Sequence, residues 1–157
     1  MGWDQVSIAL LGVLAMLLVS AAVEDIRIRE IADWKNIAIA TLAPAFWWAT
    51  GYQLWPDVAI QLGLGLAVFG LFTLAFMAGQ MGGGDVKMLG ALALWFPWQP
   101  LLSLLMVMAL AGGALTILLV IERRIRRKSG QPEIPYGVAI AFAGLVSIHQ
   151  PILNHFG

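Results

Sequence analysis

Long uncharged apolar tracts alternate with short polar segments along this chain of 157 residues. A helix needs about 20 apolar residues to cross the ~30 Å hydrocarbon core of a bilayer. The pattern therefore predicts an all-α, polytopic membrane bundle of about six transmembrane helices, in a single domain of residues 1–157. The tracts expected to form these helices are residues 5–23, 36–56, 58–77, 84–96, 101–121 and 134–157.

The fourth helix is the least obvious of the six. Residues 88–96 alone would give a helix of about 14 Å, which is too short to cross a membrane. The helix must therefore also take in residues 84–87, and this brings Asp85 and Lys87 into its first turn. We expect the Asp85 carboxylate to lie slightly below the membrane surface, whereas residues 24–35 are expected to form a solvated polar connection.

Composition agrees with an integral membrane protein. Hydrophobic residues make up 61% of the chain and charged residues 11%, against about 45–50% and about 25% in soluble domains. The net charge is zero, so nothing indicates a nucleic-acid partner. The chain has no cysteine, which excludes disulfides and thiolate metal sites. We expect no metal and no cofactor, because the two histidines, His149 and His155, fall near the face opposite the acidic residues.

The basic residues predict the orientation of the bundle. Six helices place all of them on one face, which the positive-inside tendency makes cytoplasmic, and both termini then lie outside the cytoplasm. We expect the cluster at residues 123–128 to contact anionic lipid head groups. The nine basic residues are Arg27, Arg29, Lys35, Lys87, Arg123, Arg124, Arg126, Arg127 and Lys128.

The stretch at residues 80–87 places Asp85 and Lys87 beside three glycines, in the middle of an uncharged apolar region. An ionisable residue at membrane depth is costly, and it therefore indicates a functional site. Glycines without side chains permit a broken helix start and a close approach of backbone. This stretch is thus the first candidate for chemistry.

Asp25 ends the first apolar tract and Asp85 begins the fourth, so both carboxylates are expected at the same end of the bundle. Two carboxylates at close range cannot both ionise, and such a pair can activate water and protonate a leaving amine. Glu24 competes with Asp25 for this role. Neighbouring side chains on a helix point about 100° apart, so we expect Glu24 to be dispensable for catalysis.

Two other functions remain open on the residues alone. One is a small ion- or proton-coupled transporter with Asp85 and Lys87 on its path, and the other is a non-enzymatic assembly factor. A transporter requires charges near the middle of the membrane, whereas the two aspartates fall near one surface.

Three segments resemble a known family, in the right order along the chain. Gly82-Gly83-Gly84-Asp85 fits the Gly-x-Gly-Asp signature of intramembrane aspartyl proteases, and residues 82–88 resemble the second aspartate motif of the type IV prepilin peptidase family. Residues 25–31 resemble the first aspartate motif of its short members, which serve tight-adherence (Flp-type) pili. Residues 135–141 resemble the late Pro-x-Gly-x-Ala segment.

The resemblance implies an aspartic endopeptidase of the bacterial inner membrane that removes prepilin leaders at the cytoplasmic face, without a cofactor. It implies Asp25 and Asp85 as the catalytic pair, with prepilin, membrane lipid and the pilus or secretion assembly machinery as partners. The residues expected to support the site or line a substrate groove are Gly82, Gly84, Lys87, Arg27, Arg29, Pro135, Tyr136 and Gly137.

The chain departs from the family pattern in two places. Ile31-Ala32-Asp33 stands where the family usually has Ile-Pro-Asn, which affects a local turn and an uncharged polar contact. The amino-terminal domain with cysteine pairs, found in the long members, is not in this sequence. The resemblance therefore implies peptidase activity and not the N-methyltransferase activity of those members.

Overall fold

The computed structural model describes residues 5–127, 129–130 and 133–156, and side chains as far as residue 149 in the last helix. The described residues form six α-helices and contain no strand, which confirms the all-α class. The helices are α1 (Gln5–Ile28), α2 (Asp33–Ala49), α3 (Ala59–Met77), α4 (Gly83–Ala93), α5 (Trp98–Ile125) and α6 (Tyr136–Phe156), with a short π-helical turn, Leu54–Val58, leading into α3.

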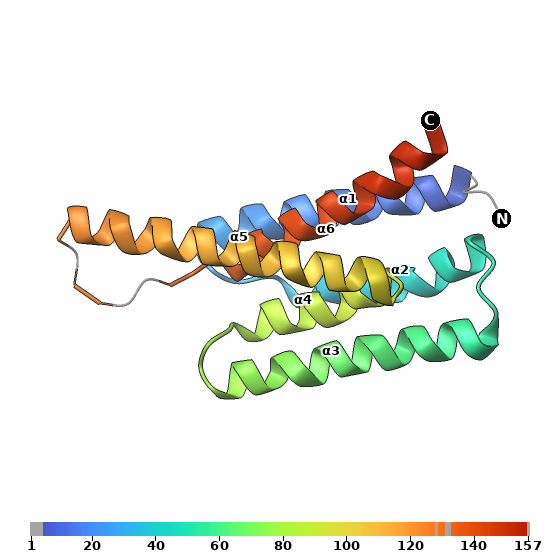
Figure 1. Ribbon diagram of the computed structural model, residues 1–157, viewed down its shortest axis with the longest axis horizontal. Helices are drawn as coiled ribbons and strands as arrows, with labels where there is room; N and C mark the ends of the chain where they lie inside the picture. Colours follow the sequence, from blue (N-terminus) through green and yellow to red (C-terminus); the bar gives the residue numbers. More distant parts are fainter. Residues whose placement is uncertain (1–4, 128, 131–132, 157) are drawn as a thin grey trace.

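Figure 1 shows α1 and α6 side by side, with α5 next to α6, while α4 packs against α2, α3 and α6. The connections α1–α2, α3–α4 and α5–α6 lie at one end of the bundle, the left end in Figure 1. The other two connections lie at the opposite end, where α1 begins and α6 ends. The basic segments therefore share one end, as predicted, although Lys128 lies outside the described residues.

In the described part of the chain, three helical segments are long and apolar enough to cross a membrane: Gln5–Ile28, Leu54–Met77 and Trp98–Ile125. The expected bounds were wrong for two other helices. The helix predicted from residues 36–56 is α2, which ends at Ala49, and the helix predicted from residues 84–96 ends at Ala93. With 11 residues, α4 is only about 16 Å long.

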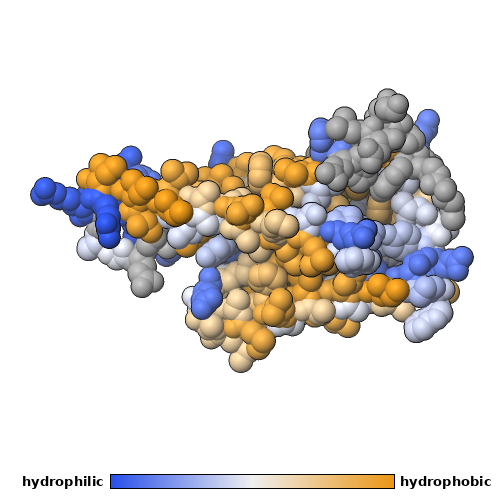
Figure 2. All heavy atoms as spheres, viewed as in Figure 1, coloured by the Kyte–Doolittle hydropathy of each residue, from blue (hydrophilic) through white to orange (hydrophobic). Residues whose placement is uncertain are grey.

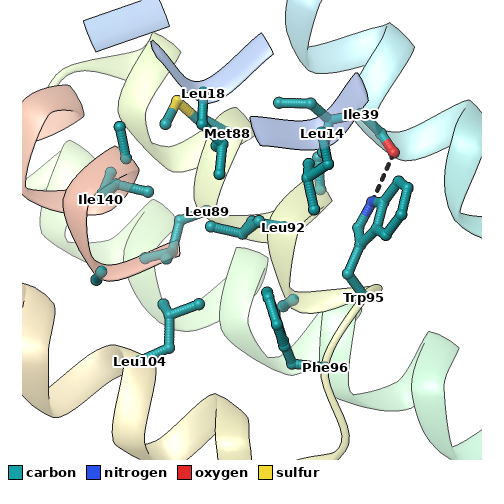
Figure 3. Close-up of a cluster of buried hydrophobic side chains, with 14 of the residues drawn as sticks. Leu14, Leu18, Ile39, Met88, Leu89, Leu92, Trp95, Phe96, Leu104 and Ile140 are labelled. Atoms are coloured by element: carbon teal, nitrogen blue, oxygen red, sulfur yellow. Dashed lines mark hydrogen bonds between the residues drawn. The ribbon is translucent and has the colours of Figure 1, made fainter. Parts of the chain in front are cut away.

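The short helix α4 is surrounded by the other helices instead of by lipid. Its buried side chains include Met88, Leu89 and Leu92, which Figure 3 shows facing residues of the neighbouring helices, among them Leu18 and Ile140. Burial on all sides explains how so short a helix persists, because tertiary packing supplies most helix stability in proteins.

Neighbouring side chains also satisfy backbone carbonyls at the carboxyl end of α4. The buried Gln61 of α3 donates hydrogen bonds from Nε2 to the carbonyls of Ala93 (2.8 Å) and Phe96 (2.6 Å). Trp47 Nε1 donates to Leu94 O at 2.8 Å. The last carbonyls of a helix have no partner within it, so these bonds fix the point at which α4 stops.

The outer surface is apolar over the middle of the molecule. Figure 2 shows apolar side chains along α5 and α3 on the visible face, with hydrophilic side chains at the tip of α5. Such a surface is suited to contact with lipid tails. The most exposed apolar side chains of α5 are Leu102, Met106, Leu110, Ile117, Leu118 and Ile125.

Candidate active site

Asp25 lies in α1, because this helix continues to Ile28 instead of stopping at residue 23. The interpretation of residues 24–35 as a solvated connection was therefore wrong at both ends, because residues 24–28 belong to α1 and residues 33–35 belong to α2. The Asp25 side chain is buried, with 4% of the residue exposed. The backbone N–H of Val138, in the first turn of α6, donates to Asp25 Oδ2 at 3.3 Å. The amino end of α6, where free N–H groups favour a negative charge, thus faces this carboxylate.

Asp85 lies in the first turn of α4, as predicted, and is 8% exposed. The backbone amides of Gly82, the residue that caps α4, and of Gly137 in α6 face its carboxylate. The Gly137 backbone also faces Asp25, and Asp25 is close enough to Asp85 to act on it electrostatically. The amino ends of α4 and α6 therefore meet at a pair of acidic groups.

The two aspartates face a common cleft. Two connected recesses, of about 420 and 670 Å³, are both lined by Asp25, Arg29, Gly82 and Asp85. The first runs along the α1–α2 connection to Asp33, and the second runs past the α3–α4 connection to the start of α6. A peptide bound along both recesses would thus pass directly over the two carboxylates.

Among the described residues that line this cleft, acidic side chains outnumber basic ones. Besides the aspartate pair, its lining contains Glu30, Asp33 and Glu133, whereas Arg29 is the basic residue that lines it. Arg29 follows the end of α1 with a positive φ of 58°, a backbone conformation in which the chain can turn sharply out of a helix. The charge of the cleft favours a basic peptide.

Side chains at the glycines near the pair would crowd the aspartates or Ile31. A Cβ atom on Gly137 would lie 2.8 Å from Asp25 Oδ2 and 2.8 Å from Ile31 Cδ1, which is closer than real Cβ contacts. A Cβ on Gly82 would lie 3.0 Å from Asp85 Oδ2. Gly84 is less restricted, since its Cβ would touch Ile31 at 3.4 Å. Gly137 is therefore the most constrained of these glycines.

Lys87 pairs with Asp33 and not with Asp85, its near neighbour in the sequence. Its Nζ pairs with Asp33 Oδ1 at 2.8 Å, and both side chains are at least half exposed. Asp33 is one of the residues that depart from the family pattern, and it thereby links the start of α2 to α4. Asn36, one turn later, donates from Nδ2 to Gly84 O at 3.3 Å and supplies an uncharged polar contact to the glycine segment.

The remaining predicted site residues divide into two groups. Tyr136 lines the larger recess, and Pro135 is buried just before α6 begins. Arg27 is exposed and lines neither recess. Among the described residues there is no group of three His, Asp or Glu side chains that could hold a metal ion.

Sequence reasoning missed an ion pair beside the cleft. Lys35 of α2 is 5% exposed, and its Nζ pairs with Glu24 Oε2 at 2.9 Å while donating to Ser20 O at 3.1 Å. Glu24 Oε2 also accepts the backbone N–H of Ala32 at 3.0 Å. These contacts tie the last turns of α1 to the first turn of α2 and give Glu24 a structural role, while its dispensability for cleavage stays a prediction.

Comparison with known proteins gives one family and several partial relatives. A profile described as the type IV leader peptidase family matches residues 12–117. The chain is 35% identical over 77 residues to the prepilin leader peptidase/N-methyltransferase of Dickeya chrysanthemi, covering 49% of this chain and 25% of that protein. It is 33% identical over 82 residues to the Pseudomonas aeruginosa protein of the same name, and these residues cover 52% of this chain and 27% of that protein.

A protein with the same description from Stutzerimonas stutzeri is 36% identical over 96 residues, which cover 60% of this chain and 32% of that protein. The chain thus spans between a quarter and a third of the length of these curated relatives. No solved structure gives a significant match.

The close approach at Gly137 leads to a stability prediction. Gly137→Ala is expected to lower the free energy of unfolding by about 1–3 kcal/mol, because the added methyl group overlaps Asp25 and Ile31. Gly113→Ala is the matched control, since a Cβ there has nothing within 4 Å. Thermal unfolding of the detergent-solubilised proteins measures both, and equal stability of the two variants would contradict the packing described.

The contacts of Lys35 lead to a second prediction. Glu24→Gln and Lys35→Met should each lower the melting temperature by several degrees, and the double variant should lose less than the sum, because the two side chains act as one pair. The control is Glu122→Gln with Arg126→Met, an exposed pair on one helix face that should contribute little. Additive losses at Glu24 and Lys35 would show that the pair does not couple α1 to α2.

Proposed function

The chain belongs to the type IV leader peptidase family, and on that premise we propose that it is a membrane-embedded aspartic endopeptidase. It removes the leader peptide from type IV (Flp-like) prepilins, with Asp25 and Asp85 as the catalytic pair. The observation that carries this proposal is the meeting of two buried carboxylates in one open cleft. The named activity of the partial relatives supports the same reaction.

The pair acts with one carboxyl protonated and the other ionised, since two close carboxylates do not both ionise. The ionised carboxylate removes a proton from a water molecule. This water attacks the carbonyl carbon of the peptide bond that joins the leader to the rest of the prepilin. The protonated carboxyl group then donates its proton to the leaving nitrogen. The backbone amides at the start of α4 and α6 stabilise the negative charge that remains on the pair.

The cytoplasmic face is the proposed site of cleavage. The cleft lies at the end of the bundle that carries the basic connections, and such segments are retained in the cytoplasm. Both termini then lie on the outer side of the inner membrane. Glu30 and Glu133 are suited to a short basic leader, and assembly machinery for the pilus is the expected downstream partner.

The transporter alternative fits the arrangement less well. It needs Asp85 and Lys87 together on an ion path, whereas Lys87 pairs with Asp33 at an exposed surface. Asp85 instead shares its cleft with Asp25.

Leader removal from a co-expressed prepilin tests the catalytic pair. Asp25→Asn and Asp85→Asn should each reduce cleavage at least about a hundredfold, because each removes half of the acid–base machinery. The double variant should be no worse than the single ones, since the two groups work as a unit. Asp57→Asn, at the opposite end of the bundle, is the control and should cleave normally.

The readout is the fraction of prepilin that has lost its leader on a gel, with equal amounts of each variant in the membrane. Substantial cleavage by either single aspartate variant would refute the pair and favour the transporter.

A further inference from the structure

The connection between α1 and α2 places one large apolar side chain, that of Ile31, beside the aspartate pair. Ile31 is the only such side chain among the described residues that line the smaller recess of the cleft, where the other lining residues are charged or small. Ile31 is nevertheless only 7% exposed. Most of its surface is therefore covered by the protein itself and does not face a bound peptide.

Ile31 packs between the amino ends of two helices. On the α4 side, a Cβ built on Gly84 would lie 3.4 Å from Ile31 Cβ, so the backbone of Gly84 rests against Ile31. On the α6 side, a Cβ built on Gly137 would lie 2.8 Å from Ile31 Cδ1, so the tip of Ile31 occupies the space that a side chain at position 137 would need. One side chain thus touches both helix ends.

These two glycines lie next to the carboxylates. Gly84 directly precedes Asp85 in the first turn of α4, and a Cβ built on Gly137 would lie 3.0 Å from Asp25 Cγ. A change in the volume of Ile31 is therefore expected to change the distance between the two helix ends, and with it the distance between the two carboxylates.

The backbone that carries Ile31 is held in place on its carboxyl side. The N–H of Ala32 donates to Glu24 Oε2 at 3.0 Å, which ties the connection to α1. Asp33 pairs with Lys87 at 2.8 Å, which ties it to α4. A β-branched side chain on a fixed backbone has few conformations, so Ile31 is suited to act as a rigid spacer.

We propose that Ile31 is a positioning residue of the peptidase, which fixes the separation of Asp25 and Asp85 by packing between the amino ends of α4 and α6. This inference rests on the proposed function and deepens it, because two carboxylates share one proton and act on one water molecule only when they are held at close range. Ile31 carries no group that takes part in the reaction, so its effect is exerted through the pair.

Truncation of Ile31 separates its two contacts. Ile31→Val removes Cδ1 and leaves Cβ, so it loosens the contact with Gly137 and keeps the contact with Gly84. Ile31→Ala removes every side-chain atom beyond Cβ. Ile148→Ala is the matched control, because Ile148 is 3% exposed and lies about 16 Å along α6 from Gly137.

The readout is kcat and KM for leader removal from a purified prepilin, with thermal unfolding of each variant measured beside them. We expect kcat to fall at least about tenfold in Ile31→Ala and by less in Ile31→Val, with KM within about twofold of normal, because misplaced catalytic groups slow the reaction without weakening binding. Ile148→Ala should lower the melting temperature by a similar amount, since it also empties a buried site, and should leave kcat close to normal.

An unchanged kcat in Ile31→Ala, or an equal loss of kcat in Ile148→Ala, would overturn the proposal. A rise in KM alone would also overturn it, because it would show that Ile31 contacts the substrate instead of setting the pair. If Ile31→Ala does not fold, Ile31→Val compared with Ile148→Val decides the question by the same criteria.

The unaltered chain separates this inference from the proposed function. Its failure to remove the leader would refute the peptidase and the role of Ile31 with it. Leader removal by the unaltered chain and by Ile31→Ala at the same kcat would refute the spacer alone.

Discussion

The structure depends on keeping two carboxylates buried where the amino ends of α4 and α6 meet. Removing a charged carboxylate from water is strongly unfavourable unless nearby groups compensate. Here the compensation comes from backbone amides: Val138 and Gly137 of α6 face Asp25, and Gly82 and Gly137 face Asp85. The start of α6 also lies close to Asp25 and Ile31, where a Cβ on Gly137 would come within 2.8 Å of both side chains.

The short helix α4 follows from the same requirement. To bring its amino end to the pair, α4 begins inside the bundle and ends after 11 residues, far short of a full membrane crossing. Hydrogen bonds from Gln61 and Trp47 to backbone carbonyls at its carboxyl end make this early ending stable. On its other sides α4 packs against α2 and α6, and α2 is itself tied to α1 by the pair Lys35–Glu24. Asp85 is thereby held in a fixed position relative to Asp25.

Much of this architecture was predictable from the pattern of residues. The apolar tracts and the position of the basic residues predicted six helices with Asp25 and Asp85 at one end, because hydrophobic length and charge placement are local properties of the sequence. The carboxyl end of α4 was not predictable, since Gln61 bonds to Ala93 and Phe96, more than 30 residues away. The Lys35–Glu24 pair was missed because residues 24–35 have the polar composition of a loop. The role of Gly137 depends on its distance from Asp25, which no local pattern encodes.

We propose that the two carboxylates act together on one reacting atom. The most direct test uses a prepilin-derived peptide in which the bond to be cut is replaced by a hydroxyl-bearing carbon, compared with the same peptide lacking that hydroxyl. A mimic of the transition state binds tightly only where the catalytic groups are arranged for it. We expect the hydroxyl to strengthen binding to the unaltered chain, and we expect this gain to disappear in both Asp25→Asn and Asp85→Asn. A gain that survives in either variant, or no gain in the unaltered chain, would contradict the proposal.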